Sequence, residues 1–93
     1  MNADRPSLIR ARLLEALAPC EVEVQDDSHL HVGHVGAREG GGHFSVRIVA
    51  ERFDGLAPLA RHRLVYAALG EMMQGPIHAL AITAITPDEE TPE

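Results

Sequence analysis

A glycine and proline break divides the C-terminal half of the chain into a helical part and an extended part. Residues 59–73 repeat apolar side chains at helical spacing, and the pair Gly75 and Pro76 then stops the helix. Residues 77–86 follow with the composition of a strand. The sequence therefore predicts a helix and a strand joined by a tight turn, and the rest of the chain has to pack around this unit.

The N-terminal half predicts one more helix and two more strands. Asp4 is a candidate N-cap, Pro6 suits the first turn of a helix, and Pro19 ends that helix. Residues 21–25 and 43–50 alternate polar and apolar side chains, which is typical of half-buried strands. The helix would bury an apolar stripe made of Ile9, Leu13, Leu14 and Leu17.

The predicted fold class is α+β, with the order helix, strand, strand, helix, strand (αββαβ). We expect the first two strands to pair as an antiparallel hairpin, and a right-handed crossover through the second helix to lay the last strand parallel to the second. Both helices then cover one face of a three-stranded mixed sheet. The chain is predicted to be a single domain over residues 1–93, ordered from about 5 to 87, with a frayed acidic tail at 88–93.

Composition and charge favour a protein partner over nucleic acid. The net charge is −6, all eight basic residues are arginine, and aromatic residues make up 3% of the chain. An acidic chain gains no overall counterion-release affinity for DNA and has few rings on which bases can stack. Binding to DNA would require a local arginine patch.

The cysteine content and the motifs limit the possible chemistry. Cys20 is the sole cysteine, so one chain cannot form an internal disulfide or a closed cysteine metal site. No Walker loop, GxSxG, HExxH or CxxC motif is present, and we expect no enzyme activity. The sequence has neither a secretory signal pattern nor an apolar run long enough for a membrane span, so we expect a cytoplasmic protein.

Histidines are concentrated where the predicted topology brings two parts of the chain together. If the third strand runs parallel to the second, its first residues lie at the sheet end where the hairpin loop emerges, so His78 becomes a neighbour of that loop. Imidazoles ligate zinc, iron and copper, so the residues suggest an all-imidazole metal site there, the alternative being solvated loop histidines that cluster by chance. Cys20, at the other end of the sheet, should not join it. The loop and the strand after it carry His29, His31, His34 and His43.

The second helix has basic residues beside a histidine. A helical wheel places His62 near the middle of an apolar face with Leu59 and Tyr66, which predicts a hydrogen-bonded core histidine. Arg61 and Arg63 flank it and are interpreted as solvated side chains.

With these residues in view, the sequence resembles the BolA family from about Leu8 to Pro87. The resemblance rests on ERFDGLAPLARHRLVYAALGEMM followed by PIHALAI, together with DDSHLH and GHFSVRIV. It is greatest to bacterial members that carry histidine in place of cysteine in the hairpin loop. The resemblance implies an αββαβ domain related to class II KH folds, which agrees with the topology predicted from the residues.

The resemblance also implies a function and a partner. BolA proteins bind monothiol glutaredoxins and share a bridging 2Fe-2S cluster, to which the glutaredoxin contributes a cysteine and glutathione a thiolate. The BolA side supplies two ligands, which carry over onto His78 and most naturally onto His31. His34 and His29 are alternative loop ligands. His43 ranks below them, because strict alternation would put it on the open sheet face and His78 on the helix-covered face.

The leading hypothesis is therefore a noncatalytic adaptor in iron-sulfur cluster trafficking or iron regulation, whose free form is a monomer or a weak homodimer. One alternative is a DNA-binding transcriptional regulator that uses the KH-like fold with Arg52, Arg61 and Arg63. Another is a simple zinc or copper site made by His78 and the loop histidines His29, His31 and His34.

Overall fold

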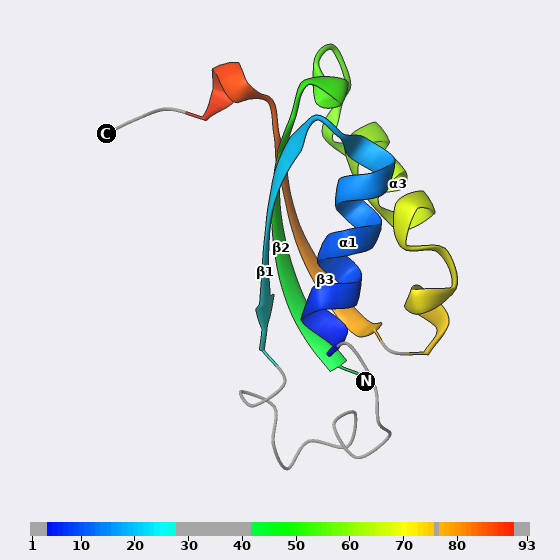
Figure 1. Cartoon of the computed structure of the whole chain (residues 1–93). Coiled ribbons are helices and arrows are strands. Elements are labelled where there is room, and N and C mark those ends of the chain that lie inside the picture. Colours follow the sequence, from blue (N-terminus) through cyan, green and yellow to red (C-terminus); the bar gives the residue numbers. More distant parts are fainter. Residues whose placement is uncertain (1–3, 28–41, 76, 91–93) are drawn as a thin grey trace.

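The computed structural model describes residues 4–27, 42–75 and 77–90. The order of its helices and strands is the αββαβ order predicted from the sequence (Figure 1). No helix in these ranges has the length and the apolar composition needed to cross a membrane. The elements are α1 (Arg5–Leu17), β1 (Cys20–Asp26), β2 (Gly42–Ala50), η2 (Glu51–Phe53), α3 (Pro58–Leu69), η3 (Gly70–Gln74), β3 (Ile77–Ile85) and η4 (Pro87–Glu89).

The three strands form one mixed sheet with β2 in the centre. β1 runs antiparallel to β2, with Cys20 opposite Ala50 and Asp26 opposite Phe44, whereas β3 runs parallel to β2. Figure 1 shows α1 and α3 on the same face of the sheet. The predicted strand pairing and the predicted one-sided helix layer are both confirmed.

The first helix forms for the reasons that its sequence suggests. The Asp4 carboxylate accepts a hydrogen bond of 2.9 Å from the Ser7 backbone N–H, and this bond lowers the pKa of Asp4. Three of the four residues in the predicted apolar stripe, Ile9, Leu13 and Leu17, are buried, and the fourth is half-buried. Each buried side chain of this size stabilises the fold by about 1.5–3 kcal/mol.

The second long helix is rotated relative to the prediction. Val65 and Leu69 are fully buried, but Leu59 is 63% and Tyr66 43% exposed, and His62 is only half-buried. Arg61 lies on the side of the helix that faces the sheet, where its guanidinium donates hydrogen bonds to the backbone oxygens of Leu56 and Ala84. The prediction of His62 at the middle of the buried face is wrong.

Residues after β3 fold back onto the domain. Thr86 and Glu89 form a capping box around η4, with bonds of 3.0 and 3.2 Å. The Arg61 guanidinium donates to both carboxylate oxygens of Glu89, at 2.6 and 2.9 Å, and Arg47 pairs with Glu90 at 3.1 Å. The sequence predicts a frayed tail from residue 88, whereas these contacts hold residues 88–90 in place.

Candidate metal centre

The backbone around His43 is fixed at the first residues of β2. The Asp27 backbone N–H donates a hydrogen bond of 2.7 Å to the His43 carbonyl oxygen, which ties the end of β1 to the start of β2. The preceding residue has to be glycine in this geometry, because a Cβ on Gly42 would lie 2.4 Å from Cε2 of the buried Phe44 ring. His43 is half-buried, and its Nε2 atom is inaccessible to water.

A β-bulge positions His78. In the ladder between β2 and β3, Gly42 pairs with Ile77 and His43 pairs with Ala79, so His78 is the extra residue. Both Ile77 and Leu80 consequently pack against the core, although they are three residues apart. Bulges redirect side chains and are common next to functional sites. Here the bulge leaves His78 exposed, off the helix-covered face where strict alternation would place it.

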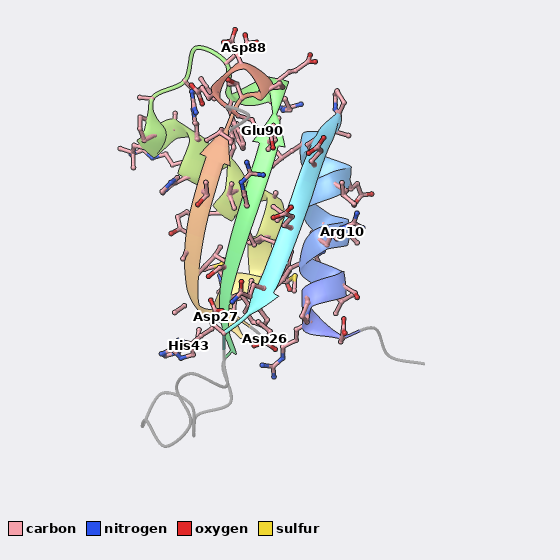
Figure 2. The ribbon with its side chains drawn as sticks, turned by 90° about the vertical axis from the view of Figure 1, so that its left-hand side faces the viewer. Arg10, Asp26, Asp27, His43, Asp88 and Glu90 are labelled. Carbon is pink, nitrogen blue, oxygen red and sulfur yellow. The ribbon has the colours of Figure 1, made fainter. Side chains whose placement is uncertain are left out.

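The bulge brings His78 next to His43. The two imidazole ring centroids lie 5.2 Å apart, and the ring planes are tilted by 48°. Figure 2 shows His43 at the same end of the sheet as Asp26 and Asp27. Among the described residues, no group of three or more His, Cys, Asp or Glu side chains is arranged to hold a metal ion. Within the described residues, the candidate metal ligands are therefore the two imidazoles of His43 and His78.

The predicted loop ligands His29, His31 and His34 lie outside the described residues. The ends of their loop are described, however. Asp27 hydrogen-bonds to His43, and Gly42 pairs with Ile77, so the chain leaves the sheet from β1, on the far side of β2, and re-enters it beside the first residue of β3. The predicted start of β3 at the sheet end where β1 ends and β2 begins is therefore confirmed, and the approach of the loop histidines to His78 stays a prediction.

Asp27 makes polar side-chain contacts at the end of the sheet that carries His43. Its carboxylate accepts hydrogen bonds from the Ser45 hydroxyl and, at 2.8 Å, from the Gln25 side-chain amide. A shallow depression on the open sheet face is lined by Asp27, His43 and Ser45 together with β3 residues that include Ala79. Asp27 and His43 therefore line the same surface depression, where the Asp27 carboxylate contributes negative charge.

Cys20 lies at the opposite end of the sheet, as predicted, since it pairs with Ala50. Its thiol is half-buried, with Sγ 3.9 Å from the Leu13 carbonyl oxygen, and burial raises its pKa. A thiol with a raised pKa stays protonated at neutral pH and is a poor metal ligand.

The ranking of His43 below the loop histidines rested on strict alternation along β3, and the bulge removes that reason. One signal in the sequence indicates the bulge. In the segment IHAL, two large apolar residues lie three positions apart, and a regular strand cannot bury both on one face.

The basic residues considered for nucleic acid occupy different environments. Arg52 and Arg63 are exposed. The Arg61 side chain is 12% exposed and is bonded to Glu89, Leu56 and Ala84, so its interpretation as a solvated residue is wrong. The hydrogen bond to Glu89 raises the pKa of Arg61, and the same contact, with the Thr86 backbone N–H, lowers the pKa of Glu89 to about 2.

The family of the chain follows from its similarity to known proteins. The model of the family described as BolA-like protein matches residues 13–89. The chain belongs to the BolA family. The human BolA-like protein 1 is 51% identical over 79 residues, which is 85% of this chain and 56% of the human protein. The chain thus spans little more than half the length of the mammalian BolA relatives that it matches.

Solved structures of other BolA proteins have the same fold. The structure of BolA1 from Arabidopsis thaliana is 36% identical, with a TM-score of 0.80 over 97% of this chain and 100% of that chain. The BolA domain of SufE1 from the same plant is 40% identical, with a TM-score of 0.79 over 96% of this chain and 99% of that chain. Together these BolA structures confirm the predicted α+β class.

Proposed function

We propose that this BolA-family chain is a noncatalytic adaptor that binds a monothiol glutaredoxin and co-ligates a bridging 2Fe-2S cluster as cargo for trafficking or iron regulation. The observation that carries the proposal is the position of His78. Its ring lies 5.2 Å from that of His43, at the sheet end where the histidine-bearing loop begins and ends. Because the chain belongs to the BolA family, these neighbouring imidazoles are candidate ligands of the shared cluster that the resemblance implies.

The donor set fits one iron of such a cluster. Neutral imidazole is a common ligand of iron, and in Rieske centres two histidines replace two cysteines on one iron and raise the reduction potential. Two imidazoles leave the other coordination positions to the partner, namely to a glutaredoxin cysteine and a glutathione thiolate. Stable cluster binding should consequently need both proteins.

The second ligand has two sources in this proposal. His31, with His34 and His29 as alternatives, would come from the loop, whereas His43 would come from β2. The loop ligands follow from the resemblance, and the His43 ligand follows from the observed ring contact with His78. Single alanine substitutions at these four positions separate the two sources.

The experiment is cluster reconstitution in a mixture of this protein, a monothiol glutaredoxin and glutathione, followed by visible absorption and circular dichroism. We expect a spectrum specific to the mixture, which the His78→Ala variant loses while it keeps its thermal unfolding temperature, because His78 is exposed. His62→Ala on α3 is the matched control and should retain the signal. A mixture spectrum equal to the sum of the separate proteins would contradict the proposal.

The DNA-binding alternative gains no support of its own from the geometry. Arg61 is engaged by Glu89, which leaves Arg52 and Arg63 on a chain with a net charge of −6. Two exposed arginines release few counterions on binding. A role of Arg52, Arg61 and Arg63 in DNA binding therefore remains a prediction from the sequence.

A further inference from the structure

The backbones of the histidine pair are anchored by buried neighbours in the two strands. Each histidine follows or precedes a residue that is 2% exposed, namely Ile77 before His78 and Phe44 after His43. The strand ladder fixes both backbones, and the Asp27 N–H fixes the His43 carbonyl oxygen. The relative position of the two histidine backbones therefore depends on buried packing, which resists displacement.

We infer that His43 and His78 form a preformed two-imidazole site that binds a divalent transition-metal ion in the free protein, without a glutaredoxin. Two imidazoles on one tetrahedral ion, with metal–nitrogen bonds of about 2.0–2.1 Å, place their ring centroids about 5 Å apart. The observed separation is 5.2 Å. A bulge that moves His78 off the helix-covered face beside His43 provides this spacing across two neighbouring strands.

The donors and the surroundings define the class of ion. Imidazole nitrogens suit Zn²⁺, Cu²⁺ and Ni²⁺, whereas Mg²⁺ and Ca²⁺ need sets of oxygen ligands. The Asp27 carboxylate lines the same depression as His43 and favours a cation there. Cys20 is at the other end of the sheet, so thiolate does not contribute. Two protein ligands leave positions for water or for a donor from a partner.

This site differs from one built on the loop, and a triple variant separates them. In His29→Ala/His31→Ala/His34→Ala, the loop has no imidazole, while the pair on β2 and β3 is intact. Isothermal titration calorimetry with Zn²⁺ alone should show one equivalent bound to this variant. Adding His43→Ala or His78→Ala to it should weaken the affinity by about tenfold or more, since one of two nitrogen ligands is lost. Adding His62→Ala should leave the affinity unchanged.

Nuclear magnetic resonance of the same samples distinguishes a loss of Zn²⁺ binding from a loss of folding. Backbone amide spectra report whether each variant is folded, and imidazole signals report which rings shift with Zn²⁺. Shifts of His43 and His78 in the triple variant support the site. Loss of Zn²⁺ binding in a folded triple variant, or wild-type affinity after His43→Ala is added to it, overturns it. No glutaredoxin or glutathione is present, so either result is distinct from the fate of the shared-cluster proposal.

Discussion

The two ends of the sheet use their polar residues in opposite ways. At the end where β3 finishes, the Glu89 carboxylate accepts hydrogen bonds from Arg61 and from the Thr86 backbone N–H, and Arg61 also donates to the Ala84 backbone oxygen. At the end where β3 starts, His43 and His78 stand side by side next to the ends of a histidine-bearing loop. The first arrangement anchors the C-terminal residues, and the second offers metal ligands. Buried packing supports both ends, and among the described residues the pair of neighbouring imidazoles lies at the histidine end.

The largest expected effect is on the histidine end. In Gly42→Ala the new Cβ would lie 2.4 Å from the buried Phe44 ring, so the ring or the strand must move. Overpacking of this kind lowers the free energy of unfolding by about 1–3 kcal/mol, and we expect displaced His43 to weaken Zn²⁺ binding. Urea unfolding and calorimetry check both effects.

A second substitution tests whether that effect comes from the Phe44 contact. Combining Gly42→Ala with Phe44→Leu provides space for the Cβ, so the two changes should cost less together than the sum of their separate costs. Additive costs would show that the Phe44 contact is not the cause.

A smaller effect is expected at the arginine end. Arg61→Ala removes the bonds to Leu56, Ala84 and Glu89 and should lower the thermal unfolding temperature by several degrees. Arg63→Ala changes the same residue type on the same helix at an exposed position, and should leave the unfolding temperature nearly unchanged. Both variants should retain the cluster spectrum. Equal unfolding temperatures for the two variants would show that the Arg61 contacts do not stabilise the fold.

The Arg61–Glu89 contact also predicts a pH dependence. The pKa of Glu89 is lowered from 4.5 to about 2 in the folded protein, so its contribution to stability is complete above pH 4.5 and is lost as the pH falls toward 2. The difference in unfolding free energy between the wild type and Glu89→Gln should shrink across this interval. A difference that stays constant from pH 5 to 2 is inconsistent with the lowered pKa.

The smallest effect is expected from the cysteine. Cys20 lies at the arginine end, and burial raises the pKa of its thiol. Cys20→Ser should therefore leave the glutaredoxin-dependent cluster spectrum and the Zn²⁺ affinity unchanged. Loss of either signal in a folded variant would break the assignment of function to the histidine end.

The sequence predicts most of the fold because its patterns are local. Alternation in residues 21–25 and 43–50, helical spacing in α1, and the Gly75 and Pro76 break are sufficient for the order of elements and the parallel crossover. That topology in turn places His78 at the loop end of the sheet. These inferences need no knowledge of tertiary contacts.

The parts that could not be predicted depend on contacts between distant residues. The side of α3 that faces the sheet includes Arg61, which bonds to the backbone oxygen of Ala84, 23 positions away. The pairing of His43 with His78 follows from a bulge in the ladder between β2 and β3. Strict alternation assumes a regular strand, so it misplaced His78, and the helical wheel counted the exposed Leu59 and Tyr66 as core residues, so it misplaced His62.

The most direct test of the account is the ligation of the shared cluster by histidine nitrogen. Pulsed electron paramagnetic resonance of the reduced cluster, formed with a glutaredoxin and glutathione and with ¹⁵N-histidine in this protein alone, reports nitrogen bound to iron. We predict ¹⁵N-histidine couplings in the wild-type complex and their loss, together with the cluster, in His78→Ala. A cluster that forms without any histidine coupling, or persists unchanged in His78→Ala, would contradict the account.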